Sequence, residues 1–131
     1  MEILEKYIKE IEEDLKIDEF NIKEASLKSP GRKHYWVSRL IHHKRNLQEL
    51  EKQKSITIKK IAKELQHQAP VKLTDSTLER AVLESQVIKD ILQKVNDERL
   101  LIEFLEKTEK TFSSLTYDIK NIIEIMKLEQ L

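Results

Sequence analysis

The sequence predicts an all-α protein made of long helices, and three observations support this. Only one Gly and two Pro interrupt the 131 residues, so few positions break a helix. Charged residues make up 37% of the chain and hydrophobic residues 39%, and such a mixture, rich in Glu, Lys, Leu and Ile, is typical of long helices. Apolar residues also recur at spacings of three and four along two extended segments. We therefore expect one all-helical domain over residues 1–131, arranged as an elongated helical hairpin or bundle.

The N-terminal 28 residues are expected to form acidic helices. Residues 1–16 are amphipathic, with apolar side chains on one face and acids on the other. Asp18 is a suitable N-cap for a short second helix that ends near Lys28. Residues 1–31 contain five bases and nine acids, which gives this end of the chain a net charge of −4.

A long basic helix is predicted over residues 30–68. Ser29 is a favourable cap, and Pro30 suits the first helical position, where its missing N–H is not needed. The helix is expected to end before Pro70, because the residue that precedes a proline disfavours helical backbone angles. Ten of the 24 Lys and Arg residues lie within residues 32–63 with only two acids, so this segment has a net charge of +8.

The basic and apolar side chains of this helix are predicted to lie on different faces. Arg45, Lys52 and Lys59 are seven residues apart, so they form one line that Lys63 continues. Charged runs on helices are usually solvated surface. Here few acids lie close enough to neutralise the run, so a polyanion such as a nucleic-acid backbone would gain from counterion release. Phosphate contacts of this kind do not read base sequence. The apolar seam has heptad-like spacing and comprises Trp36, Leu40, His43, Leu47, Leu50, Lys54, Thr57 and Ile61.

A second long helix is predicted over residues 76–131. Ser76 and Glu79 have the spacing of a capping box, and neither Gly nor Pro follows. Hydroxyl side chains, which are weak helix formers, indicate a bend near residues 113–117. The 39-residue basic helix would be about 58 Å long, so antiparallel pairing of the two long helices is expected to leave apolar surface for self-association.

Catalysis and metal binding are not predicted. One Gly cannot form a phosphate-binding loop, and the absence of Cys removes thiolate nucleophiles, thiolate metal sites and disulfides. His42 and His43 are adjacent, so they point about 100° apart on a helix and cannot share a metal ion. We expect instead that His43 is a hydrogen-bonded interfacial residue. Trp36 is expected in the core, with base stacking as the alternative. The sequence therefore predicts no enzyme, no catalytic residue, no metal site and no cofactor.

The sequence also predicts a soluble cytoplasmic protein. The N-terminus carries acids in place of an apolar signal region. No run approaches the roughly 18 apolar residues that a membrane span requires.

Seven collinear segments resemble one known family. They are residues 17–18, 24–30, 34–36, 47–54, 81–83, 102–105 and 117–122. In order and spacing they are similar to the UvsY family, the recombination mediators of T-even-type bacteriophages and their relatives, over nearly the whole chain.

This resemblance implies a non-enzymatic helical protein that forms a ring-like homo-oligomer, a hexamer or heptamer. It implies binding to single-stranded DNA. It also implies contacts with a RecA-type recombinase and with a single-strand-binding protein, because such mediators load the recombinase onto coated strands. In a phage-encoded protein the location would be the host cell cytoplasm.

The resemblance also assigns roles to residues. The family's basic motif begins at Lys59, but its second basic position is Ile61 in this chain. Thr116 stands where the family has a Gly beside Tyr117, which implies a less sharp final bend. The basic helix itself supplies the candidate DNA-binding residues, which are Arg39, Lys44, Arg45, Lys52, Lys59, Lys60 and Lys63. The candidate oligomerisation residues are Ile102, Leu105, Phe112, Ile119, Ile123 and Met126.

A structural adaptor is the alternative that the sequence leaves open. In that interpretation the basic helix docks an acidic protein partner, or the acidic helices of a neighbouring copy, and nucleic acid is not bound. Such an assembly would dissociate at high salt, because its contacts would be ion pairs at the surface.

Overall fold

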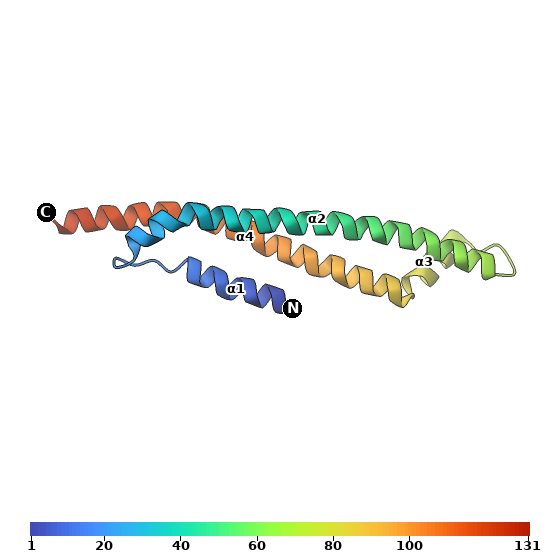
Figure 1. Ribbon diagram of the computed structural model, residues 1–131. Helices are drawn as coiled ribbons and strands as arrows, with labels where there is room; N and C mark the ends of the chain where they lie inside the picture. Colours follow the sequence, from blue (N-terminus) through green and yellow to red (C-terminus); the bar gives the residue numbers. More distant parts are fainter. The chain divides into compact units, whose positions relative to one another are not determined.

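The computed structural model describes all 131 residues, and they form α-helices and no strands (Figure 1). The prediction of an all-α fold is confirmed. None of the helices combines the length and the apolar character needed to span a bilayer. The helices are α1 (Glu2–Asp14), α2 (Ile22–Gln68), α3 (Asp75–Leu83) and α4 (Gln86–Glu129).

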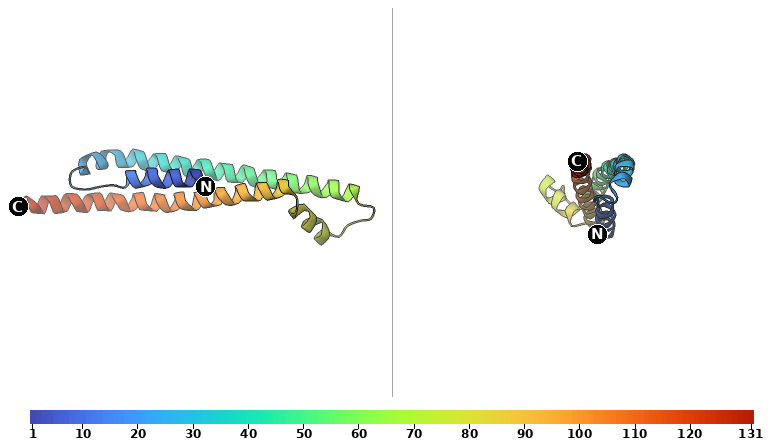
Figure 2. Two further views of the ribbon diagram at one scale, coloured as in Figure 1. Left: turned by 90° about the horizontal axis from the view of Figure 1, so that it is seen from below. Right: turned by 90° about the vertical axis from the view of Figure 1, so that its left-hand side faces the viewer.

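The chain divides into two compact units, of which unit 1 contains Met1–His42 and Leu101–Leu131. In unit 1, α1 lies alongside the N-terminal part of α2 and the C-terminal part of α4 (Figure 2). Most of its core consists of apolar side chains of the two long helices, and α1 adds Ile11. Its buried apolar side chains are Ile11, Ile22, Trp36, Leu40, Leu101, Ile102, Leu105, Phe112, Leu115 and Ile119.

Unit 2 contains His43–Leu100 and has a smaller apolar core. Val82, Ile88 and Val95 are its fully buried apolar side chains. His43 is buried as well, and its Nδ1 lies 2.8 Å from Oε2 of Glu98. This confirms the expectation of a hydrogen-bonded histidine on the seam, and the bond satisfies a polar group inside a small core.

The structure corrects the predicted start of the basic helix, because α2 begins at Ile22 and not at residue 30. A turn directly before the helix sets this start. Asp18 Oδ1 accepts the N–H groups of Phe20 at 2.8 Å and Asn21 at 3.0 Å. Asn21 Oδ1 in return accepts the N–H of Asp18 at 2.8 Å. These reciprocal bonds form a turn that ends at Asn21, whose C=O accepts the first helical bond from the N–H of Ala25 at 2.9 Å.

Pro30 lies inside α2, so the predicted boundary between a short acidic helix and the basic helix is wrong. Proline cannot donate to the carbonyl four residues earlier, that of Ser26, but Ser26 is on the exposed side of the helix. Upstream of the proline, burial of Ile22 stabilises the first turns of the helix. Figure 1 shows these first turns inclined to the part of α2 that follows, which is the bend that a proline produces.

The start of α3 also differs from the predicted capping box. Thr74 is the N-cap, and its Oγ1 accepts the N–H of Thr77 at 3.2 Å. Asp75 is the first helical residue, so the helix begins one residue before the predicted Ser76.

The structure has two helices where one C-terminal helix was predicted, because the helix is interrupted between Leu83 and the start of α4. The C=O of Ser85 accepts the N–H of Lys89 at 3.0 Å and so starts a new helix. Serine favours the N-cap position. Val82 and Ile88 are six residues apart and would point about 120° apart on one continuous helix. The break allows both side chains to be buried.

No helix break occurs at residues 113–117, where a bend was predicted, and α4 continues to Glu129. The hydroxyls of Thr108, Thr111 and Ser113 each donate to the carbonyl four residues earlier, at 2.9, 3.0 and 3.2 Å. Each hydroxyl therefore finds its partner inside the helix, and the backbone ladder continues.

Candidate nucleic-acid interface

A line of exposed basic side chains runs along the C-terminal part of α2 in unit 2. No ion pair or hydrogen bond engages these side chains. At about 3.6 residues per turn, four of them fall within an arc of about 40°, and they extend over about 27 Å. We call this set the cationic ridge; its members are Arg45, Lys52, Lys59, Lys60 and Lys63.

Two acids lie beside the cationic ridge and reduce its charge only in part. Glu49 is about one turn from both Arg45 and Lys52, and Glu64 is one turn after Lys60. The five bases and two acids together have a net charge of +3. This part of unit 2 therefore presents an uncompensated positive surface.

The end of the ridge borders a surface hollow that the sequence did not predict. It is lined by Lys60, Lys63, Glu64, His67 and Gln68. His67 is exposed and lies one turn after Lys63. Lys63 and His67 are four residues apart, and this spacing in the sequence could have predicted that His67 lies next to the ridge.

Two of the candidate DNA-binding residues lie away from the ridge. Lys44 is exposed but directly precedes Arg45, so the two side chains point about 100° apart. Arg39 lies in unit 1, where its Nη1 donates to Oε2 of Glu10 at 2.9 Å.

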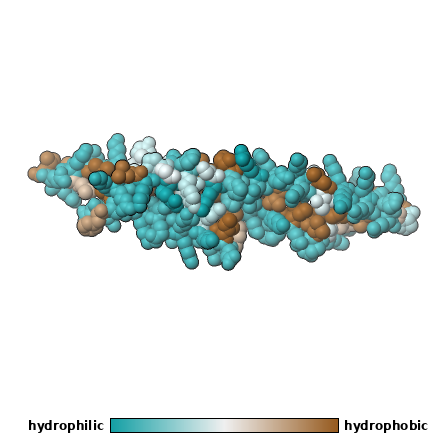
Figure 3. Space-filling model, in the orientation of Figure 1, coloured by the Kyte–Doolittle hydropathy of each residue, from teal (hydrophilic) through white to brown (hydrophobic).

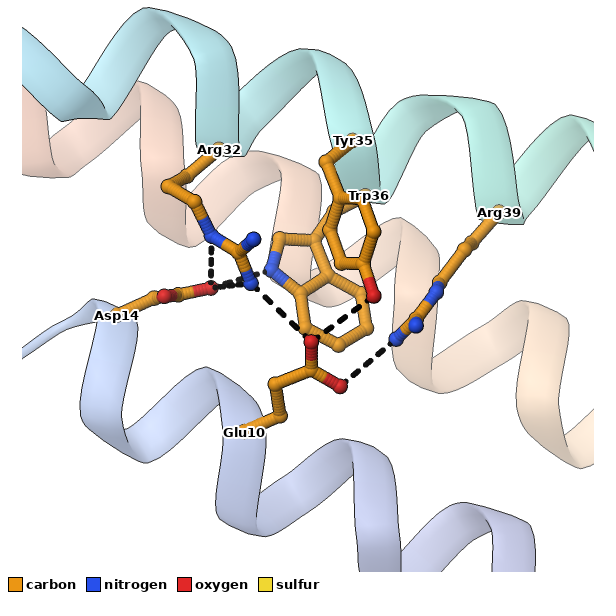
Figure 4. Close-up of polar contacts among 6 residues, drawn as sticks. All are labelled: Glu10, Asp14, Arg32, Tyr35, Trp36 and Arg39. Carbon is orange, nitrogen blue, oxygen red and sulfur yellow. Dashed lines mark hydrogen bonds and ion pairs between the residues drawn. The ribbon is translucent and has the colours of Figure 1, made fainter.

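Arg39 belongs to a group in which acids of α1 meet basic and aromatic side chains of α2 (Figure 4). The carboxylate of Glu10 accepts three hydrogen bonds. They come from Arg39, from the Tyr35 hydroxyl at 2.9 Å and from Arg32 Nη2 at 3.2 Å. We call this group the α1 cluster; its members are Glu10, Asp14, Arg32, Tyr35, Trp36 and Arg39.

Asp14 is the second carboxylate of the α1 cluster. Its Oδ2 accepts from Arg32 Nε at 2.9 Å and lies 2.7 Å from Arg32 Nη2. The same oxygen accepts from Trp36 Nε1 at 2.8 Å. Trp36 has only 1% of its surface exposed, which confirms that it is a core residue and that its polar edge has a partner.

The ion pairs of the α1 cluster shift two pKa values. Burial acts to raise the pKa of Glu10, but hydrogen bonds from Arg39 and Arg32 outweigh it and hold this pKa below its usual value. The hydrogen bond to Asp14 is the largest cause that raises the pKa of Arg32. Both shifts favour the charged forms that join α1 to α2.

Glu10→Gln is expected to lower stability at neutral pH and to approach the wild type at low pH. The folded-state pKa of Glu10 is lowered, so its charge stabilises the fold above the unfolded value of about 4.3. That stabilisation is lost as the pH falls through the folded-state pKa. Because the pairs are partly exposed, we expect an effect of at most about 1 kcal/mol.

Urea midpoints of both proteins between neutral and acidic pH test this, with exposed Glu12→Gln as the control. A difference that stays constant across the range would contradict it.

Four of the candidate oligomerisation residues are buried inside unit 1. Leu105 and Phe112 have 1% of their surface exposed, Ile119 has 6% and Ile102 has 9%. These side chains stabilise the protomer and offer almost no surface to another copy. Ile123 and Met126 are half-buried, and the adjacent Ile125 and Leu128 are exposed.

The exposed cations of the ridge have the charge needed to bind anions. No group of three or more His, Asp or Glu side chains is placed to hold a metal ion. Lys and Arg side chains at the ridge can neutralise phosphates or carboxylates.

Comparisons with known proteins show the family and the fold of the chain. The sequence matches the family described as "Recombination, repair and ssDNA binding protein UvsY" over residues 10–130. The fold is similar to that of a crystal structure of the bacteriophage T4 recombination mediator protein UvsY. The TM-score is 0.82 at 16% identity, over 96% of this chain and 98% of that one. A second crystal structure of that T4 protein gives a TM-score of 0.81 at 16% identity, over 98% of both chains. No curated protein matched by sequence. Because the family match spans nearly the whole chain, the protein belongs to the UvsY family.

Proposed function

We propose that the protein is a recombination mediator that binds single-stranded DNA through the cationic ridge. Membership of the UvsY family supports the mediator role. The observation that best supports this location of the binding site is that five basic side chains are exposed and have no intramolecular partner. Such side chains release condensed counterions when they contact phosphates, and they do so without reading sequence.

We further propose that the protein acts as a homo-oligomer, a hexamer or heptamer, in the cytoplasm of the phage host. Repeating a ridge of modest affinity on each subunit would raise the overall affinity for a strand that contacts several ridges. Apolar side chains at the end of α4 support self-association, because Ile125 and Leu128 are 55% and 67% exposed beside Ile123 and Met126. Figure 3 shows apolar side chains among hydrophilic ones at this end of the molecule. A light-scattering mass equal to one 15.6 kDa chain would contradict the oligomer.

The proposed partners are a RecA-type recombinase and a single-strand-binding protein. The mediator would hold the strand by its backbone and leave the bases available to the recombinase. Recombinase assembly on coated strands that is no faster with this protein than without it would contradict the mediator role.

The salt dependence of binding tests the ridge. Anisotropy of a labelled oligo(dT) is expected to show binding at about 50 mM salt that weakens strongly by about 200 mM. Three to five ridge contacts predict a slope of log K against log salt between about −2 and −3.5 for each engaged subunit. Absence of binding at the lower salt, or binding that salt does not affect, would contradict the proposal.

A further inference from the structure

The surface of α2 beneath α1 combines cations with aromatic rings. The guanidinium carbons of Arg32 and Arg39 lie 4.2 and 4.1 Å from the centroid of the Tyr35 ring. That of Arg39 also lies 4.8 Å from the Trp36 ring. Arginine beside aromatic rings is the composition of sites that bind single-stranded nucleic acid by neutralising the backbone and stacking bases.

The two carboxylates of the α1 cluster occupy anion positions on this surface. Asp14 meets the fork of Arg32 at both Nε and Nη2, a geometry in which arginine also binds phosphate. Glu10 takes donors from Arg39, Arg32 and Tyr35 (Figure 4). If α1 detached, these donors would be left without an anion.

Helix α1 is held by these polar contacts and by a small apolar contact, in which the Tyr7 ring meets Trp36 edge-on with ring centroids 5.4 Å apart. Ile11 is its only buried residue, whereas Ile3 and Ile8 are 38% and 36% exposed. The Arg32 and Arg39 side chains are themselves about one-third exposed, so salt and solvent weaken their pairs. Detachment of such a segment costs less than global unfolding.

We propose that α1 covers a second site for single-stranded DNA, and that Glu10 and Asp14 hold the places that phosphates take when α1 detaches. The site consists of Arg32, Tyr35 and Arg39 in unit 1 and is separate from the cationic ridge of unit 2. This inference extends the proposed function, because α1 competes with the strand and limits binding in the resting protein.

Neutralising the two carboxylates tests the competition. Glu10→Gln with Asp14→Asn is expected to bind oligo(dT) several-fold more tightly than the wild type. Its salt slope should be steeper by about 1.4, because two arginines gain phosphate contacts. Glu5→Gln with Glu12→Gln is the matched control, since both glutamates lie exposed on α1 and the charge change is equal. Adding Arg32→Ala and Arg39→Ala to the first variant should abolish the gain.

Trp36 reports on α1 in the unmodified protein, because it is the only tryptophan and it bonds to Asp14 of α1. Saturating oligo(dT) at low salt should increase quenching of its fluorescence by acrylamide. The inference would be overturned if the protein binds DNA but acrylamide quenches Trp36 equally with and without oligo(dT).

The outcomes separate the two proposals. If the wild type binds DNA and the carboxylate variant matches its control, the covered site is wrong and the ridge stands. If only the carboxylate variant binds DNA, the ridge is wrong and the covered site stands. If neither protein binds DNA, both proposals are wrong.

Discussion

Replacing Trp36 with alanine is expected to destabilise the protein by about 3–5 kcal/mol. The indole is 1% exposed and makes edge contacts with Tyr7 and Tyr35, with ring centroids 5.4 and 5.2 Å away. Its removal would leave a cavity in unit 1, where α1 and α2 meet. It would also remove the 2.8 Å hydrogen bond to Asp14. Small domains have a total stability of about 5–15 kcal/mol, so this loss is a large fraction of it.

Urea unfolding followed by circular dichroism measures this effect. Phe20→Ala is the matched control, because this aromatic side chain is 91% exposed and its loss should change stability by less than about 0.5 kcal/mol. A Trp36→Ala protein whose stability lies within about 1 kcal/mol of the wild type would show that the indole is not part of a packed core.

Replacing Lys59, Lys60 and Lys63 together with alanine is expected to weaken binding to oligo(dT) about 100-fold at about 0.1 M salt. Each single-strand phosphate contact contributes about 0.7 to the salt slope, which corresponds to about 5-fold in affinity at that salt concentration. The slope itself should fall by about 2. The three side chains are exposed on α2, so the substitutions remove charge without disturbing a core.

A matched triple variant separates local contacts from net charge. Lys89, Lys94 and Lys120 are exposed on α4, and their replacement by alanine removes the same charge from helical positions. We expect a small loss of affinity and a nearly unchanged salt slope in this control. Equal losses in the two triple variants would assign the binding to the general field of the protein and not to the ridge.

Much of the fold follows from periodicity in the sequence. Spacings of three and four place Trp36, Leu40 and His43 on one seam, and all three are buried. Seven-residue spacing places Arg45, Lys52 and Lys59 on another face, and all three are exposed. A helical period fixes which residues share a face, so both surfaces could be predicted without knowledge of the tertiary contacts.

The errors concern features that tertiary contacts decide. Proline usually marks a helix boundary, but packing of Ile22 and the turn at Asp18 extend α2 through Pro30. The break at Ser85 follows from the orientation of side chains on both sides of it, which local propensity does not report. Four of the proposed oligomerisation residues are buried within the protomer. The sequence could not show this, because a periodic apolar seam looks the same whether it packs within one chain or between copies.

The α1 cluster could not be predicted because its partners are far apart in the sequence. Glu10 and Asp14 are one turn apart on α1, and Arg32, Tyr35 and Arg39 follow at spacings of three and four on α2. These spacings place each set on one face of its helix. Only the approach of the two helices shows that Arg32 and Arg39 are already paired with carboxylates of α1.

Lysine footprinting tests the central claim most directly, namely that the cationic ridge is the surface that meets the strand. The wild-type protein would be acylated with and without saturating oligo(dT), and each lysine would be quantified by mass spectrometry. We expect DNA to protect Lys52, Lys59, Lys60 and Lys63, while Lys89 reacts equally in both samples. Equal reactivity of the four ridge lysines in a sample that is demonstrably bound to DNA would contradict the claim.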